Sequence, residues 1–432
     1  MAEAAKSLPS LDLSSLPGPD DILRQELDNG VVVMSRENFA SPSIVISGFL
    51  PAGSIFDPSG KEGLASLTAS ALMRGTGQRS FNEIYQSIES IGANLSIGAG
   101  THFASFRGKA LAADLPLLLE LLAEALQEPT FPEAAVEQLR AEKLTGLSIR
   151  DQNTRARANM AFDELAYPDH PYRRPSDGHR ETVTNLNLTD LERFHTEHYG
   201  PAGLVISIVG AIKVEEAVEA VAGALGAWTA RAEVSELHVP DVEAPEKLVR
   251  THVPLADKSQ SDFVLGAPGP RRSHPDYLAA SLGNNVLGRF GLMGRLGDSI
   301  REQAGLAYYA YSSLGGGVGP SPWRVMAGVN PENVEKAIDL ARKELGRFAQ
   351  EEVTAEELFD VQSNYIGRLP LQLESNEGVA GSLIHIERHG LGLDYYRRYP
   401  GLIAEVTRSD IQRVAEEFLH PDRLALGIAG PS

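Results

Sequence analysis

The sequence predicts an α+β protein built from two homologous α/β-layer domains that arose by internal duplication. Three observations lead to this prediction. The chain has 432 residues and is 42% hydrophobic, which is more than one compact core usually organises. Its predicted helices and paired strands come in groups rather than in strict alternation. A stretch near residue 190 recurs without a gap near residue 410.

Local patterns assign the elements of the first half in order. The turn dipeptide Asn29-Gly30 precedes the first strand, and a capping box of Ser80 and Glu83 marks a helix start. Alternation with period two indicates strands, and apolar spacings of three and four indicate helices. The expected elements are strands at 31–34 and 43–50, helices at 62–73 and 80–91, strands at 93–97 and 102–110, and helices at 115–127 and 132–150.

The internal repeat gives the domain division. Residues 189–197 read TDLERFHTE, residues 409–417 read SDIQRVAEE, and the same offset relates Gly210 to Gly430. A duplicated unit of this kind usually forms two similar domains that face each other across a cleft. We therefore expect an extended leader at 1–19, a first domain at 20–229, a linker at 230–249 and a second domain at 250–432.

Composition excludes several functional classes. Lys and Arg number 39 against 58 Asp and Glu, a formal charge of −19, and no basic run is present, so we expect no nucleic-acid partner. The absence of cysteine rules out disulfides and cysteine nucleophiles and fits a reducing compartment. Acidic residues interrupt the most apolar stretch, 110–126, so we expect no membrane partner. We expect a cytoplasmic protein, or a periplasmic one if a signal peptide was removed.

One helix and several landmarks carry a family resemblance. Residues 63–76 read GLASLTASALMRGT and resemble the signature helix of the pitrilysin and mitochondrial-processing-peptidase family, the inverzincins, whose motif is H-x-x-E-H. Further landmarks follow in the family's order, namely PAGS at 51–54, YPDHPY at 167–172 and REQAGLAY at 301–308. The resemblance covers nearly the whole chain and implies that the two domains form half of a clam-shaped peptidase chamber.

The sequence departs from this family at the metal site. Zinc in such a site needs two imidazoles one helical turn apart, a neighbouring Glu that activates water, and a third protein ligand. Ser66 and Ser70 stand at the histidine positions, and Ala69 stands at the position of the general base. The family's third ligand is a Glu on the later long helix, but residues 143–150 contain no carboxylate. We therefore expect a degenerate metal site and no cofactor in this chain.

Arg301 and Tyr308 form a pair to which the family resemblance assigns a function. In the family, an Arg and a Tyr at this spacing reach from the half without zinc into the half that holds it. A guanidinium and a phenol O–H are suitable donors for negative charge on a peptide carbonyl oxygen. The spacing puts Arg301 at a helix end and Tyr308 on the following strand, so both side chains are expected to point into one cleft. An Arg that caps a helix and a Tyr that packs on a sheet are the structural alternative.

A glycine-rich segment follows this strand. We expect Gly315, Gly316 and Gly317, with Gly319, to form a mobile substrate loop at the chamber wall, as in the non-catalytic subunit of the processing peptidase. Ordinary hairpin loops are also rich in glycine, which is the alternative interpretation.

Together these features predict the zinc-free subunit of a heterodimeric zinc metallopeptidase. Its partner would be a homologous subunit that carries the H-x-x-E-H helix and the zinc, and its substrate would be an unfolded peptide. Arg301 and Tyr308 would complete the partner's active site, so this chain alone would not hydrolyse peptides. Its excess of acidic residues would favour basic peptides. The alternative is a structural or binding homologue with no role in proteolysis, similar to core subunits of a respiratory complex.

Two histidine pairs offer weaker hypotheses. His385 and His389 lie one helical turn apart, which would suit a metal ion in an independent metallohydrolase, but Arg388 would oppose a cation. His195 and His198 are also one turn apart. The matching positions in the second repeat hold apolar residues, which favours a packing role for the two histidines. The glycine run at 288–297 lacks G-K-[ST], and no G-x-S-x-G elbow occurs, so nucleotide binding and a serine nucleophile are not expected.

Overall fold

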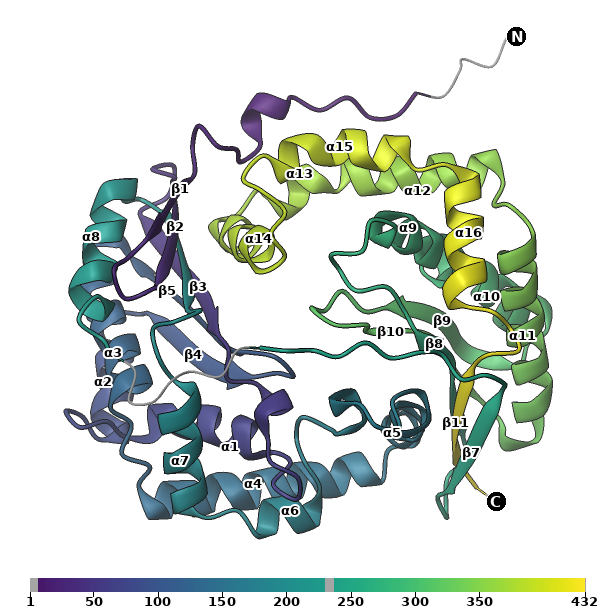
Figure 1. Cartoon of the computed structure of the whole chain (residues 1–432), viewed down its shortest axis with the longest axis horizontal. Coiled ribbons are helices and arrows are strands. Elements are labelled where there is room, and N and C mark those ends of the chain that lie inside the picture. The colour runs from purple at the N-terminus through teal and green to yellow at the C-terminus, as the bar shows by residue number, and fades with distance from the viewer. Residues whose placement is uncertain (1–6, 230–236, 432) are drawn as a thin grey trace.

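The computed structural model describes residues 7–229 and 237–431, whose strands form two separate sheets (Figure 1). The six-stranded first sheet has the order β1-β2-β6-β3-β5-β4, and the five-stranded second sheet has the order β7-β11-β8-β10-β9. The strands are β1 (Leu23–Glu26), β2 (Val32–Glu37), β3 (Ser43–Leu50), β4 (Asn94–Ala99), β5 (Ala104–Leu111), β6 (Val205–Gly210), β7 (Val249–Pro254), β8 (Ser261–Pro268), β9 (Ala307–Leu314), β10 (Pro322–Val329) and β11 (Ala425–Gly430).

Helices surround both sheets. The α-helices are α1 (Leu64–Ala71), α2 (Phe81–Ser90), α3 (Leu115–Gln127), α4 (Glu133–Asp151), α5 (Thr154–Ala166), α6 (Arg180–Thr184), α7 (Leu188–His198), α8 (Val214–Leu225), α9 (Tyr277–Gly288), α10 (Phe290–Leu296), α11 (Val334–Gln350), α12 (Ala355–Gly367), α13 (Leu369–Gln372), α14 (Asn376–Arg388), α15 (Tyr395–Glu405) and α16 (Arg408–Phe418). A π-helix, η6, spans Gly297–Gln303. Short 3-10 helices are η1 (Leu13–Ser15), η2 (Ser54–Phe56), η3 (Leu72–Arg74), η4 (Ala112–Asp114), η5 (Pro171–Arg173) and η7 (Pro331–Asn333).

The two sheets repeat one topology. β2 pairs parallel with β6, and β7 pairs parallel with β11, while the remaining neighbours in both sheets are antiparallel. The later strand of each parallel pair belongs to the internal repeat and follows the helix of that repeat. This helix and strand are α7 and β6 in the first half and α16 and β11 in the second. Both of these helices begin with a capping box. The predicted α+β fold with two homologous domains is confirmed.

Each sheet is covered on one face by helices of its own half. Alternate residues of the first sheet pack against α1, α2, α3, α7 and α8 in one large apolar cluster. The second sheet packs in the same way against α9, α11, α12 and α16. In Figure 1, α2, α3 and α8 lie at the outer side of the first sheet, and α11 and α16 lie at the outer side of the second. Successive side chains of a strand point to opposite faces of the sheet. These helices therefore cover one apolar face of each sheet, and the other apolar face must be covered by something else.

One helix from the opposite half covers each remaining face. α14 packs on β3 and β6, where Val379 and Leu383 join Val45 and Val209 in an apolar cluster. Reciprocally, α5 packs on β8 and β11, and its Phe162 lies in a cluster with strand residues of the second sheet. Figure 1 shows α14 and α5 on the sides of the sheets that face the middle of the molecule. The two halves are therefore joined by an exchange of helices as well as by the chain connection.

Local chemistry explains where α1 begins. The sequence predicts a helix from residue 62, but α1 starts at Leu64 because Gly63 has a φ of 96°. The carboxylate of Asp57 accepts hydrogen bonds of 2.8 Å from the backbone N–H groups of Gly63 and Ala65. Asp57 thus caps a helix to which it is not adjacent in the sequence, and no local capping pattern reveals it.

The expected leader packs on the second half of the chain in the part that is described. Leu16 is buried, and its carbonyl oxygen accepts a 3.0 Å hydrogen bond from Nε of Arg397. Among residues 7–229 and 237–431, no helix has the length and apolar character needed to cross a bilayer.

Candidate functional site

α1 carries the three positions at which the family places its zinc machinery. Ala69 is buried, Ser66 is half-buried, and Ser70 is exposed and donates a 2.9 Å hydrogen bond to the carbonyl of Ser66. Nζ of Lys143, on α4, lies 2.7 Å from Oγ of Ser66. The same ammonium lies 3.2 Å from Oδ1 of Asp177. A lysine side chain therefore fills the space between α1 and α4.

These residues do not fit a zinc ion. Neutral serine hydroxyls are poor zinc ligands, a methyl group cannot accept a proton, and an ammonium repels a dication. Across the described ranges, no group of three or more His, Asp or Glu side chains is placed to hold a metal ion. In the sequence, Lys143 stands out only as the first residue of a stretch without carboxylates. Its contact with Ser66 depends on how two helices pack, which spacing in the sequence does not reveal.

Arg301 and Tyr308 lie on either side of a tight turn at the start of the edge strand β9. Arg301 is in the π-helix η6, and its carbonyl accepts a 3.1 Å hydrogen bond from the N–H of Gly305. Nε of Arg301 lies 3.6 Å from a carboxylate oxygen of Glu302. Tyr308 is 84% exposed. Both residues therefore sit on the surface of this chain, and neither belongs to the walls of the clefts between its two halves.

A bulge in the second sheet aims Tyr308 outward. In the register of β10 with β9, Gly328 pairs with Tyr309 and Val329 pairs with Ala307, so Tyr308 is the extra residue. Bulges of this kind redirect side chains and are common beside functional sites, as are π-helical turns. Both irregularities fall within the segment 297–308.

The glycine-rich segment connects β9 to β10 and has defined contacts. The N–H of Gly317 donates to Oγ of Ser321 at 3.2 Å, and the carbonyl of Gly317 accepts from the N–H of Arg272 at 3.0 Å. A Cβ at Gly319 would clash with the hydroxyl oxygen of Tyr172, from the first half. The segment and Tyr308 lie at opposite ends of β9, about 20 Å apart at the rise of an extended strand.

A cleft of about 820 Å³ lies between the two halves. One wall comes from the end of α4 and the start of α5, and the other comes from β9, β10 and the end of α9. A smaller cleft of about 210 Å³ shares Asp163 and Arg324 with it and extends to His102 and Tyr172. The internal duplication predicts a cleft between the two halves, but its lining depends on how α5 packs against the second half and could not be read from the sequence.

The histidine pairs are structural. Rings of His385 and His389 lie 4.9 Å apart, and burial is the main factor that lowers their pKa values, to about 4 and about 3. Glu387, between them in the sequence, points instead to an ion pair with Arg24 at 2.8 Å. His195 is buried, and its Nε2 lies 2.9 Å from the carbonyl oxygen of Leu126, which confirms the predicted packing role.

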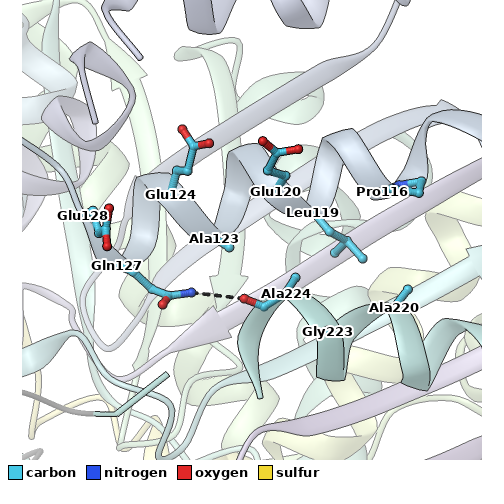
Figure 2. A pocket seen from close by; sticks show the side chains of 10 residues that line it. All are labelled: Pro116, Leu119, Glu120, Ala123, Glu124, Gln127, Glu128, Ala220, Gly223 and Ala224. Carbon is cyan, nitrogen blue, oxygen red and sulfur yellow. Dashed lines mark hydrogen bonds between the residues drawn. The ribbon is translucent and has the colours of Figure 1, made fainter. Parts of the chain in front are cut away.

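Another groove lies outside this region. A groove of about 520 Å³ lies between α3 and α8. Figure 2 shows the residues that line it, with Glu120 and Glu124 on α3. Nε2 of Gln127 crosses it to the carbonyl oxygen of Ala224 at 3.3 Å. Both helices belong to the outer layer of the first sheet, on the face opposite α14. Apart from Gln127, its described lining is small, apolar or acidic, and it is separate from α1 and from the inter-half clefts.

Two family models together match most of the sequence. Residues 32–176 match the model described as insulinase (peptidase family M16), and residues 185–365 match the model described as peptidase M16 inactive domain. The chain belongs to the M16 peptidase family. The two M16 models follow one another along the chain, one in each half, which confirms the resemblance on which the predicted fold rests.

Similar proteins include peptidases and subunits of a larger complex. An uncharacterized zinc protease of Streptomyces coelicolor is 26% identical over 83% of this chain and 79% of its own length. One of Mycobacterium leprae is 25% identical over 95% of this chain and 92% of its own. Subunit 1 of the mitochondrial cytochrome b-c1 complex of Rattus norvegicus is 24% identical over 61% of this chain and 55% of its own.

Solved structures agree on the M16 fold. A peptidase M16 inactive domain from Pseudomonas fluorescens superposes with a TM-score of 0.88 at 25% identity, covering 95% of this chain and 98% of the other. A protease from Helicobacter pylori gives a TM-score of 0.86 at 21% identity, covering 96% and 100%. With the inactive-domain match and the relative from the cytochrome b-c1 complex, these findings support a non-catalytic M16 subunit.

Proposed function

We propose that this chain is the zinc-free subunit of a heterodimeric M16 metallopeptidase. It binds an unfolded peptide together with a homologous partner that carries the H-x-x-E-H helix, and it supplies Arg301 and Tyr308 to the partner's active site. The zinc resides in the partner, where it supplies the activated water. The two domains, 20–229 and 250–432, form half of the peptidase chamber, and the complex is cytoplasmic.

The exposure of Tyr308 carries this proposal. A tyrosine that is 84% exposed contributes little to its own fold, and this one is displaced outward by a bulge at the edge of a sheet. Arg301 precedes it across the turn at Gly305, and the Arg301 side chain is 34% exposed. The two side chains are therefore accessible to a neighbouring chain.

The chemistry of the pair fits peptide hydrolysis. Negative charge builds on the oxygen of the scissile carbonyl, and the Tyr308 O–H can donate a hydrogen bond to it. The Arg301 guanidinium offers several N–H donors to the substrate backbone. Its nearest carboxylate, on Glu302, is 3.6 Å away, which is too long for a tight hydrogen-bonded pair.

The test combines this chain with a candidate H-x-x-E-H subunit and a long unstructured peptide. We expect cleavage only in the mixture and a fall in kcat of roughly 100-fold for Tyr308→Phe, the size typical of a lost oxyanion donor. Arg301→Ala should also impair cleavage. Tyr85→Phe is the matched control, because Tyr85 is another exposed tyrosine, on α2. Full activity without this chain, or with both Arg301→Ala and Tyr308→Phe in place, contradicts the proposal.

A structural role without proteolysis is the second candidate. It is favoured by the similarity to cytochrome b-c1 complex subunit 1, whose name places that relative in a larger assembly. In that case the chain would be recovered from cells in a stable complex, and Arg301→Ala with Tyr308→Phe would leave both the complex and cellular peptidase activity unchanged.

A further inference from the structure

The clefts between the two halves are lined by an excess of positive charge. Four arginines line the larger cleft, and a fifth lines the smaller one: Arg150, Arg155, Arg289, Arg324 and Arg174. Asp163 is the only carboxylate among the described lining residues of either cleft. The chain as a whole carries a formal charge of −19, so the sign inside the clefts is the reverse of the overall sign.

Two of these arginines have little internal compensation. Arg289, at the end of α9, is exposed, and its side chain makes no hydrogen bond or ion pair with any residue in the described ranges; only its backbone N–H is bonded, to the carbonyl of Asn285. Nη1 of Arg324, on β10, lies 3.7 Å from Oδ1 of Asp163, beyond hydrogen-bond distance. Nε of Arg324 is buried and finds no hydrogen-bond partner within the described structure. A buried guanidinium donor without a partner is costly unless a ligand satisfies it.

The other arginines are held in place by neutral groups or by a neighbour. Arg155 lies over the ring of Tyr309, 4.1 Å from its centroid, and Nε of Arg155 donates to the Tyr309 hydroxyl at 2.9 Å. Nη1 of Arg150 donates to the carbonyl of Gly178 at 2.8 Å. Nη1 of Arg174 donates to the carbonyl of Asp57 at 2.8 Å. Arg150 is also ion-paired with the carboxylate of Asp151 at 3.1 Å, which offsets its charge. Carbonyl and hydroxyl oxygens fix Arg155 and Arg174 without neutralising them, so the cleft keeps part of its positive field.

Asp163 offsets this field only weakly. Burial raises the pKa of Asp163 to about 7, with the charge of Arg324 acting in the opposite direction. Near neutral pH, a substantial fraction of its carboxyl groups is therefore protonated and uncharged.

We propose that these clefts bind carboxylates of a peptide substrate, with Arg289 and Arg324 as the principal contacts. This inference rests on the proposed peptide-binding function and names the class of peptide. Arginine suits the role because its planar guanidinium pairs with a carboxylate through two hydrogen bonds. The carboxylates are either the side chains of Asp and Glu residues in the peptide or the C-terminus of the peptide. A cleft of about 820 Å³ has room for a short stretch of such a peptide.

Peptide binding to the isolated full chain tests this directly. Fluorescence anisotropy compares three labelled peptides of equal length, rich in Glu, Gln or Lys, each with a free or an amidated C-terminus. We expect the Glu peptide to bind about tenfold more tightly than the Gln peptide, and binding to weaken as salt is raised. An effect confined to the free C-terminus identifies the terminal carboxylate as the ligand, and an effect that survives amidation identifies the side chains.

Variants locate the site. Arg289→Gln and Arg324→Gln should each weaken the preferred peptide about tenfold, as expected for one lost charged hydrogen-bond pair. Arg423→Gln is the matched control, because Arg423 is exposed and outside the clefts. Arg289 is at the surface, so its variant should fold with an unchanged thermal midpoint.

Two results overturn the inference. One is tighter binding of the Lys peptide, which the overall charge of −19 would produce without a local site. The other is preferred binding of the Glu peptide that Arg289→Gln and Arg324→Gln leave unchanged. Neither result bears on the shared active site, because that proposal is judged by cleavage in the mixture with Arg301 and Tyr308 variants.

Discussion

Nζ of Lys143 lies 2.7 Å from Oγ of Ser66, at the position where M16 metal chemistry would require a ligand. The Lys143 side chain is 14% exposed, so its charge is only partly screened by water. Where metal ligands are absent, at Ser66 and Ser70, a lysine from a second helix thus supplies a positive charge. The substituted positions form a consistent hydrogen-bonded arrangement that requires no metal.

Restoring the motif on α1 alone should not restore tight zinc binding. We expect Ser66→His with Ala69→Glu and Ser70→His to bind zinc weakly, because the Lys143 ammonium remains within reach of position 66. Adding Lys143→Glu removes that charge and supplies a third ligand. Affinity should then rise more than about tenfold, since like charges at this distance cost more than about 1.4 kcal/mol. Calorimetric titration with zinc measures both variants, and equal affinities would refute the repulsive role of Lys143.

Two adjacent tyrosines should respond differently to loss of the hydroxyl. The Tyr309 hydroxyl donates to Asp262 and accepts from Nε of Arg155, so it links β9 and β8 to α5. Tyr309→Phe leaves those two charged groups without their shared partner and should lower the free energy of unfolding by about 1–3 kcal/mol. Tyr308→Phe, at an exposed position, should change it by less than about 0.5 kcal/mol. Urea denaturation of both variants distinguishes them, and equal effects would contradict the assigned roles.

The contact of α5 with β11 should tolerate no side chain at Gly427. A Cβ there would lie 2.4 Å from the carbonyl oxygen of Ala158 and 2.5 Å from the backbone nitrogen of Phe162. Gly427→Ala should therefore push α5 from the sheet and lower the free energy of unfolding by about 1–3 kcal/mol. Gly381→Ala is the control, since a Cβ at that position of α14 has no neighbour within 4 Å. It should stabilise by about 0.5–1 kcal/mol, and a thermal melt that shows the reverse order would disprove the close packing.

Acid should destabilise the chain through three partly buried histidines. Burial, together with Arg388, lowers the pKa of His102 to about 4, and burial with Arg272 and Arg388 lowers that of His385 to about 4. Burial and the neighbouring His385 lower the pKa of His389 to about 3. Unfolded imidazoles bind protons near pH 6.5, so the unfolded state takes up more protons as the pH falls from 6.5 towards 4.

Stability should therefore be full above pH 6.5 and should decline below it, by about 1.4 kcal/mol per unit of pKa difference for each group. Urea midpoints at pH 7.5 and pH 5 measure this decline. His385→Gln removes one buried titrating group and should reduce the decline, whereas His420→Gln, at an exposed site, should not. An identical decline in all three proteins would exclude the histidine cluster as its cause.

Local sequence signals predicted the elements that depend on local chemistry. The helix expected at 115–127 is α3 with the same bounds, and the capping box of Ser80 and Glu83 begins α2 as expected. The repeat around residues 190 and 410 correctly located α7 and α16, which begin in the same way in both halves. Capping and periodicity act within a few residues, so one sequence suffices to read them.

The features that sequence did not reveal depend on packing between distant segments. α5 and α14 have ordinary helical patterns, and nothing in either pattern states that each covers a sheet of the opposite half. The five arginines of the clefts come from four separate stretches of the chain, since only Arg150 and Arg155 are near each other in the sequence. The bulge at Tyr308 follows from the register of two strands. The positions of Arg301, Tyr308 and the degenerate zinc residues could be named from motifs, but not their exposure or their partners.

The exchange of helices has a consequence for how the chain is made on the ribosome. The last strand of the first sheet ends at Gly210, but α14, which shields its inner face, begins at Asn376. At ordinary translation speeds, that face stays uncovered for on the order of ten seconds before α14 is synthesised. During this interval Val45, Phe49 and Val209 remain open to water. Nascent chains of this protein should therefore engage chaperones until α14 has emerged.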